Sequence, residues 1–328
     1  MTPMDLFRQI LSMDSTTGRE RELGAWLEDR LEAPFKETFE VGDGTINLLL
    51  RWSAEPRVVF CSHMDTVPPY IPPRFESDRV CGRGSCDAKG QFYAMYRACQ
   101  RLAAAGHKDF ALLIVSGEET GSWGAKAFAR TPFRAPLLVV GEPTDNCMVS
   151  ASKGTKSFGL HFSGRPFHSG YPEYGQSAVE LFLDFMERLR AAAFPEDPEL
   201  GATTWNVGEL RSDNPQNILS PALDCRLYFR TTFASDSEVV AWMRAQAGET
   251  LRIEERGGDA PAHYRTLPGF PAKPVSFGSD APHLGNFEEK IICGPGSITV
   301  AHRDDEFLAF ADLDLAIQNY VRIYESYH

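Results

Sequence analysis

Residues 58–65 read VVFCSHMD, an apolar run that leads directly into His63 and Asp65. Three later segments have the same form: ALLIVSGEE at 111–119, LLVVGE at 137–142 and IICGPGSITVAH at 291–302. Short apolar runs bounded by turn residues are typical of buried parallel strands. In open α/β sheets the ligand site lies beyond the carboxyl ends of the strands. The polar residues that follow these runs are therefore expected to converge.

The side chains expected to converge are histidines and carboxylates, the ligands that zinc prefers. They are His63, Glu119, Glu142 and His302. The Gly-rich segment RVCGRGSCDAKG at 79–90 adds Asp87, just before a helical pattern at 91–105. Because a carboxylate has two oxygens, Asp87 can hold two cations about 3.5–4 Å apart, as in two-metal hydrolases.

Glu118 stands beside the expected ligand Glu119 but faces another way. Incomplete metal shells leave room for a water, and metal binding lowers the pKa of that water to about 7. Glu118 is then placed to take the water's proton as a general base. Asp280 lies in a loop that could reach the same pocket, although a turn-forming Asp is at least as good an interpretation.

Five motifs occur in a fixed order: HMDTVP at 63–68, GRGSCDAKG at 82–90, SGEETGS at 116–122, GEPT at 141–144 and GPGSITVAHRDDEF at 294–307. Together they resemble the di-zinc amidohydrolases and peptidases that include acetylornithine deacetylase, succinyl-diaminopimelate desuccinylase, aminoacylase and the glutamate carboxypeptidases. The resemblance covers nearly the whole chain. The C-terminal motif, with FGSDAPHL at 277–284 before it, looks most like acetylornithine deacetylase.

The resemblance implies two metal ions, Zn²⁺ with Co²⁺ as an expected substitute. One zinc would be bound by His63 and Glu142, the other by Glu119 and His302, with Asp87 as the bridge. The family pattern also makes Glu118 the general base. Asp65 would orient His63 through its other ring nitrogen, as metal-bound histidines usually require.

Three further roles follow from the resemblance. In FHSGYP at 167–172, His168 would stabilise the tetrahedral oxyanion, and Asn217 and Arg230 would meet the substrate carboxylate. Two positions nearby depart from the family pattern. Ser220 stands where the family usually has Pro, and Tyr228 stands where it usually has Asp.

The pattern along the chain predicts an α/β protein of two domains. The catalytic domain, 1–153 and 260–328, is expected to hold a mostly parallel sheet with helices on both faces. Residues 154–259 form an inserted lid. Its strand patterns lie at 155–163, 203–210, 222–232 and 251–255, and its helical patterns at 177–193 and 235–246. This β-α-β-β-α-β order is the ferredoxin-like α+β arrangement.

Composition favours a soluble enzyme with a small-molecule partner. The chain has 328 residues, 43% of them hydrophobic, and a net charge of −12, which argues against nucleic-acid binding. No apolar run approaches the ~20 residues needed to span a membrane. Scattered cysteines without a CxxC pair fit a reducing cytoplasm.

We therefore expect a cytoplasmic hydrolase that cleaves the amide of an N-acyl amino acid with metal-bound hydroxide. Acetylornithine deacetylase-like activity would place it in amino-acid metabolism, in arginine biosynthesis. A dipeptidase or carboxypeptidase acting on short peptides is the alternative within the family. A non-catalytic binding protein is the alternative from another class, but a pure binder needs no base beside a ligand.

The resemblance also allows a homodimer through the lid. Its lids would pair through an exposed edge strand at 156–163 and the helix at 177–193, and the partner subunit would deliver His168. The alternative is a monomer whose lid hinges near Gly154 and Gly258.

Overall fold

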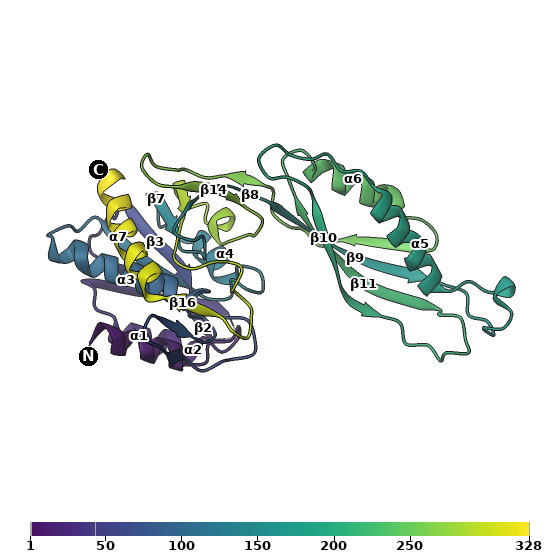
Figure 1. Cartoon of the computed structure of the whole chain (residues 1–328), viewed down its shortest axis with the longest axis horizontal. Coiled ribbons are helices and arrows are strands. Elements are labelled where there is room, and N and C mark those ends of the chain that lie inside the picture. Colours follow the sequence, from purple (N-terminus) through teal and green to yellow (C-terminus); the bar gives the residue numbers. More distant parts are fainter. Residues whose placement is uncertain (1, 43, 328) are drawn as a thin grey trace. The chain divides into compact units, whose positions relative to one another are not determined.

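The computed structural model describes residues 2–42 and 44–327 (Figure 1). The chain forms two compact units. Unit 1 runs up to Ser150 and also contains Tyr264–Lys273 and the chain from Ser279 onward. Unit 2 contains Ala151–His263 and Pro274–Gly278. The short returning segment Pro274–Gly278 thus groups with the insertion, whereas the sequence patterns placed it in the catalytic domain.

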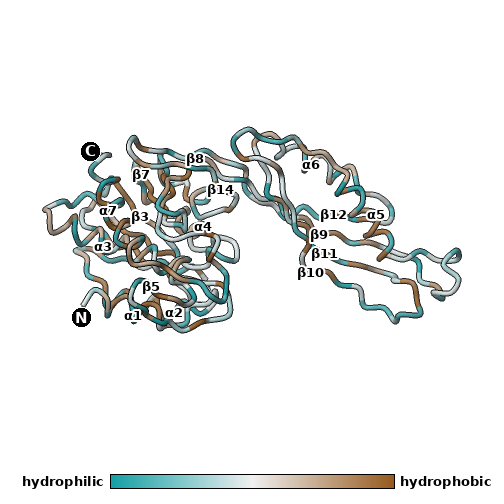
Figure 2. Tube along the Cα trace, in the orientation of Figure 1, coloured by the Kyte–Doolittle hydropathy of each residue, from teal (hydrophilic) through white to brown (hydrophobic). Residues whose placement is uncertain are grey.

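A six-stranded sheet forms the centre of unit 1, in the order β1-β2-β6-β3-β7-β15. Its strands are β1 (Phe35–Gly42), β2 (Thr45–Arg51), β3 (Val58–His63), β6 (Phe110–Val115), β7 (Ala135–Val140) and β15 (Phe287–Ile292). β6, β3, β7 and β15 run parallel, and β1 and β2 add an antiparallel edge. The four apolar runs therefore form adjacent parallel strands, as the sequence predicts. Figure 2 shows hydrophobic residues along β3 and β7.

Helices cover both faces of this sheet. The helices α1 (Pro3–Ser12), α2 (Arg21–Arg30), α3 (Lys89–Ala104) and α7 (Phe310–Tyr327) share one core with alternate strand residues such as Leu48, Phe60 and Leu112. The strand residues that alternate with these lie on the other face of the sheet, on the side of α4 (Trp123–Ala129). There Phe128 of α4 packs edge-on against Phe39 of β1, with 5.3 Å between the ring centroids. Burial of both faces explains why the parallel strands read as continuous apolar runs.

A small second sheet positions two of the motif segments. It consists of β4 (Arg74–Phe75), β5 (Arg79–Cys81) and β16 (Phe307–Ala309), in the order β16-β5-β4. β16 pairs antiparallel with β5, so the segment that leaves β5 lies beside the segment that enters β16. The amide of Gly82 donates to the carbonyl of Glu306 at 2.9 Å. The Asp87 loop and the His302 loop are joined in this way.

Unit 2 contains the β-α-β-β-α-β element order that the sequence predicts. The elements are β9 (Gly154–Ser163), α5 (Ala178–Ala191), β10 (Thr204–Arg211), β11 (Ala222–Thr231), α6 (Asp236–Gln246) and β12 (Leu251–Glu255). The sheet order is β10-β11-β9-β12, with every neighbouring pair antiparallel. Both helices contribute to one core with the inward residues of the strands, Phe158, Leu227 and Phe229 among them.

The expectation of an exposed edge strand at 156–163 is wrong. β9 is paired on both sides, with β11 and with β12. Each β-α-β crossover skips one strand position, which puts the first and third strands in the middle of a ferredoxin-like sheet. Within the described residues of this sheet the edges are β10 and β12, so pairing with another chain cannot use 156–163.

Three short strands lie where the chain passes between the two units: β8 (Met148–Ser152), β13 (Ala262–His263) and β14 (Ala272–Val275). They form a three-stranded sheet in the order β13-β8-β14. Short 3₁₀ turns lie at Pro172–Tyr174 and Ala281–His283. Among the residues that the structure describes, no helix has the length and apolar character required to cross a membrane.

Candidate metal centre

The functional side chains gather at the carboxyl edge of the parallel sheet. His63 is the last residue of β3, Glu118 and Glu119 follow β6, and Glu142 follows β7. These three strands are neighbours, so their ends meet at one edge. Asp87 comes from the loop before α3, and His302 comes from the loop before β16.

Asp87 lies between the two histidines. Its Oδ1 is 3.2 Å from His63 Nε2, and its Oδ2 is 3.2 Å from His302 Nε2. His302 Nε2 is also 3.1 Å from Glu119 Oε1. One ligand atom each from His63, Asp87 and Glu119 lies within 4.8 Å of the others. The two oxygens of Asp87 thus face two different imidazoles, as a carboxylate shared by two cations requires.

The carboxylates around the two histidines raise the pKa of both imidazoles. Hydrogen bonds to the carboxylates of Asp87 and Glu119 raise the pKa of His302 to about 10. Burial lowers the pKa of His63, but hydrogen bonds to Asp65 and Asp87 outweigh this and raise it well above its usual value. The carboxylates of this site therefore favour positive charge at both imidazoles.

Glu118 and Glu142 occupy the same acidic site. Burial raises the pKa of each well above the usual carboxyl value, and the charge of Glu118 adds to the effect on Glu142. Such crowding of carboxylates is costly unless cations compensate it. Two histidines and several carboxylates are also the donor set that zinc accepts. The residues fit two divalent cations.

Asp65 contacts both His63 and the backbone that carries Glu118 and Glu119. Its Oδ1 accepts the amide of Glu118 at 3.0 Å, and its Oδ2 accepts the amide of Glu119 at 3.1 Å. The other ring nitrogen of His63, Nδ1, lies 3.4 Å from Asp65 Oδ1 and 3.0 Å from the Asp65 carbonyl oxygen. Asp65 therefore orients the histidine and also holds the turn that carries the adjacent glutamates.

The comparisons with known proteins agree with this geometry. Residues 59–326 match the model of peptidase family M20/M25/M40. A probable carboxypeptidase of Emericella nidulans is 30% identical over 98% of this chain and 88% of its own length.

The chain belongs to this family.

Two solved structures share its fold. A tripeptidase from Staphylococcus aureus has a TM-score of 0.80 at 18% identity, over 98% of this chain and 96% of that chain. A dinuclear metal-binding M20 peptidase from Bacillus subtilis has a TM-score of 0.66 at 11% identity, over 99% and 98%. As a member of the M20 family the protein is a hydrolytic metallopeptidase, and it has the catalytic domain and inserted domain of this fold.

Sequence patterns missed a buried ion pair that holds the Asp87 loop. Glu306 Oε1 accepts the amides of Cys86 and Asp87 at 3.0 and 3.1 Å. Its Oε2 lies 2.7 Å from Arg83 Nη1, and both side chains are fully buried. Glu306 stands inside the motif at 294–307, so its place was visible in the sequence, but its contact with the Asp87 loop was not.

Asp280 does reach the site. It is buried, and burial raises its pKa to about 6, partly offset by the charge of His63 and by a hydrogen bond with Ser122. Its Oδ1 has no hydrogen-bond partner among the described residues. Asp280 is thus a component of the acidic site rather than only a turn residue.

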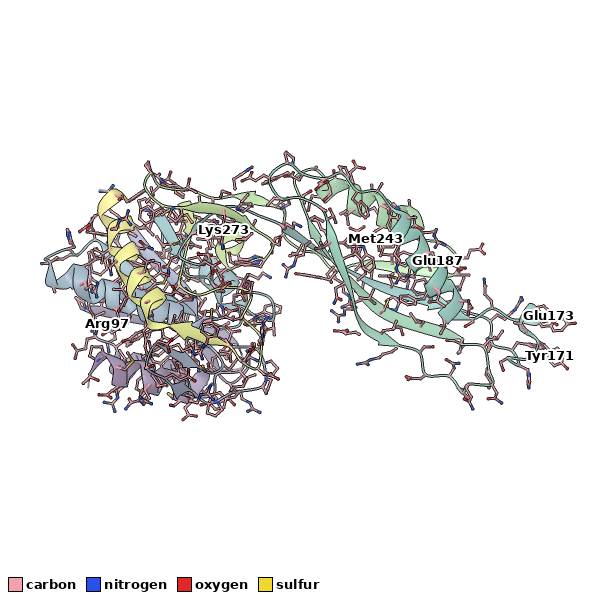
Figure 3. The ribbon with its side chains drawn as sticks, in the orientation of Figure 1. Arg97, Tyr171, Glu173, Glu187, Met243 and Lys273 are labelled. Carbon is pink, nitrogen blue, oxygen red and sulfur yellow. The ribbon has the colours of Figure 1, made fainter. Side chains whose placement is uncertain are left out.

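The lid residues lie at two different ends of the unit 2 sheet. His168 and Asn217 are together in the loops beyond the Ser163–Ala222 end, where the amide of Ser169 donates to the Asn217 carbonyl at 2.9 Å. Tyr171 and Glu173 lie in the same loop region (Figure 3). Arg230 pairs with Thr155 at the opposite end. Arg230 lies eight positions after Ala222 on β11, which corresponds to about 26 Å at about 3.3 Å per residue.

This separation constrains the predicted carboxylate contacts. A single carboxylate cannot touch Asn217 and Arg230 of one chain. Arg230 instead stacks over the Tyr228 ring at 5.0 Å, which gives the unusual Tyr228 a partner. Lys153 directly precedes β9, and after burial the charge of Arg230 is the second cause that lowers the pKa of Lys153. Two cations therefore stand close together at this end of the sheet.

Proposed function

We propose that the protein is a two-zinc exopeptidase, a carboxypeptidase or dipeptidase that cleaves the amide bond before a free C-terminal amino acid. The observation that carries this proposal is the sharing of Asp87, with one carboxylate oxygen toward each of His63 and His302. The probable carboxypeptidase among the relatives supports the peptide as substrate.

In this proposal His63 and Glu142 hold one zinc ion, Glu119 and His302 hold the other, and Asp87 contributes to both. When bound, such ions polarise the scissile carbonyl and acidify the attacking water. The burial that raises the pKa of Glu118 makes its carboxylate a stronger proton acceptor than an exposed one. Glu118 takes a proton from the attacking water and returns it to the leaving amine.

The substrate carboxylate would bind at Arg230, with Lys153 as the second cation. Arg can offer two parallel donors to a carboxylate, and a nearby ammonium adds attraction. His168 would then stabilise the oxyanion from a second chain, because it lies at the far end of the sheet from Arg230. A homodimer through the inserted domain is part of this proposal, and β10 or β12 would supply its edge.

An N-acyl amino acid deacylase, acetylornithine deacetylase-like, is the second candidate. It is favoured by the FGSDAPHL segment at 277–284 together with the motif at 294–307. Both candidates cleave an amide whose leaving group is an amino acid with a free carboxylate. They differ in the group on the acyl side, which is an amino acid in one case and a simple acid in the other.

A substrate panel separates the two candidates. Zinc- or cobalt-loaded protein is assayed on dipeptides, on tripeptides, on N-acetyl amino acids including acetylornithine, and on the C-terminal amides of the best substrates. An exopeptidase of the proposed kind turns over peptides faster than N-acetyl amino acids and is much slower on the amides. Faster turnover of N-acetyl amino acids favours the deacylase, and equal rates on the amides exclude recognition of a free carboxylate.

A further inference from the structure

We propose that Thr17 is a positioning residue for the metal centre and acts through Asp65. The inference rests on the proposed two-metal site but not on the identity of the substrate. Thr17 lies in the segment between α1 and α2, outside every motif that carries the family resemblance. Its hydroxyl reaches the carboxylate that orders both His63 and the Glu118–Glu119 turn.

The segment around Thr17 is bonded to the backbone directly after β3. The amide of Thr66 donates to the Ser15 carbonyl and the amide of Thr17 donates to the Thr66 carbonyl, both at 3.1 Å. The Ser15 hydroxyl donates to the Met64 carbonyl at 2.7 Å. The segment thus forms a parallel bridge with residues 64–66. This bridge fixes the position of Thr17 relative to Asp65.

The side chain of Thr17 completes the set of donors around Asp65. Its Oγ1 donates to Asp65 Oδ2 at 2.9 Å, the same oxygen that accepts the Glu119 amide at 3.1 Å. The other oxygen accepts the Glu118 amide at 3.0 Å. Asp65 is fully buried. A buried carboxylate needs such donors, and their number and direction determine its rotation.

Glu20, on the same segment as Thr17, contacts the turn that carries Glu118 and Glu119. It is 1% exposed and accepts the amide of Gly18 at 2.6 Å. Burial raises its pKa, and hydrogen bonds from backbone amides, including that of Gly117, oppose the rise. Gly18 has a φ of 90°, which provides the bend between Thr17 and Glu20. One segment therefore contacts both Asp65 and the residue before Glu118.

Thr16 offers a matched control on the same segment. Its hydroxyl donates to Asp14 Oδ1 at 2.7 Å, whereas among the described residues of this segment the hydroxyl bonded to Asp65 is that of Thr17. Thr16→Val and Thr17→Val each replace a threonine hydroxyl with a methyl group of similar size, at adjacent positions. Only Thr17→Val removes a donor to Asp65.

The test measures zinc affinity by chelator competition, kcat and KM on the best substrate, and the Tm of the metal-free protein. Loss of an outer contact to a metal ligand costs about 10–100-fold in metal affinity or activity. Because Thr17 contacts Asp65, which is not itself a proposed ligand, Thr17→Val is expected to lower zinc affinity and kcat by about 10-fold, the lower end of this range, with KM little changed. Thr17→Ser, which keeps the hydroxyl, restores both. Thr16→Val keeps wild-type zinc affinity, with a metal-free Tm close to that of Thr17→Val.

Wild-type zinc affinity in Thr17→Val overturns the proposal. Equal losses in Thr16→Val and Thr17→Val, or no rescue by Thr17→Ser, also overturn it, because they indicate a general weakening of the segment. The affinity measurement needs no substrate. A wrong assignment of the exopeptidase activity therefore leaves this test intact.

Discussion

At the scale of single residues, the sequence predicts where Asp65 and Glu118 lie but not which side chains orient them. Both stand in motifs that the sequence displays, and the strand-end rule placed them correctly at one edge of the sheet. The contacts that orient them come from elsewhere in the chain. Thr17 lies 48 residues before Asp65, and Arg83 lies 223 residues before Glu306. No local pattern predicts pairs at such separations, because they depend on how the whole unit packs.

Glu118→Gln tests the general base. The amide has nearly the same shape but cannot take a proton, so turnover should fall by about 10²–10⁴-fold. Metal content should stay near wild type, because Glu118 is not among the proposed ligands. Activity assays with elemental analysis of the same samples check both points, with the exposed Glu28→Gln as control. Loss of metal from Glu118→Gln, or near-full activity, would contradict the assignment of Glu118 as the general base.

Metal binding should release protons and weaken as the pH falls. The carboxylates around His302 raise its pKa to about 10, and His63 is shifted in the same direction. At neutral pH a metal must therefore displace a proton from each imidazole, and each displaced proton lowers the affinity tenfold per unit of falling pH. Calorimetric titration with zinc in two buffers of different ionisation enthalpy counts these protons. Binding without proton release at pH 7 would contradict the protonated histidines.

At the scale of elements, the order of strands and helices could be predicted and the sheet neighbours only in part. The apolar runs at 58–60, 111–115 and 137–140 became adjacent parallel strands because continuous hydrophobicity reports burial on both faces. Apolar and polar residues alternate at 155–163. This alternation indicates a strand with one buried face, but it does not indicate whether the strand lies at the edge of its sheet. Its central position follows from the crossovers, and these are a property of the whole insertion.

The Arg83–Glu306 pair should be essential to the loop that carries Asp87. Glu306→Gln leaves the buried guanidinium of Arg83 without its counter-charge, which typically costs about 3–5 kcal/mol. We expect a loss of this size in the free energy of unfolding of unit 1, measured by urea denaturation, and weaker zinc binding. Glu254→Gln, which removes the exposed partner of Arg256, is the control and should change stability little. Equal small effects of both variants would show that the buried pair is dispensable.

At the scale of the whole molecule, the proposed homodimer predicts that His168 of one chain completes the active site of the other. Mixing inactive His168→Ala with inactive Glu118→Gln tests this. In a mixed dimer one site has an intact Glu118 and receives His168 from the partner, so up to about one good site per dimer should return. Each variant incubated alone is the control. No recovery after verified subunit exchange would mean that His168 does not act from a partner.

The central claim is that Asp87 is shared by two metal ions, and the metal stoichiometry of the whole protein tests it most directly. Zinc per chain is measured by elemental mass spectrometry after reconstitution of wild type, Asp87→Ala and His63→Ala. The shared position of Asp87 predicts that Asp87→Ala lowers occupancy at both sites together, whereas His63→Ala empties mainly one. Loss of a single zinc from Asp87→Ala, with the second site filled as in wild type, would contradict the shared carboxylate.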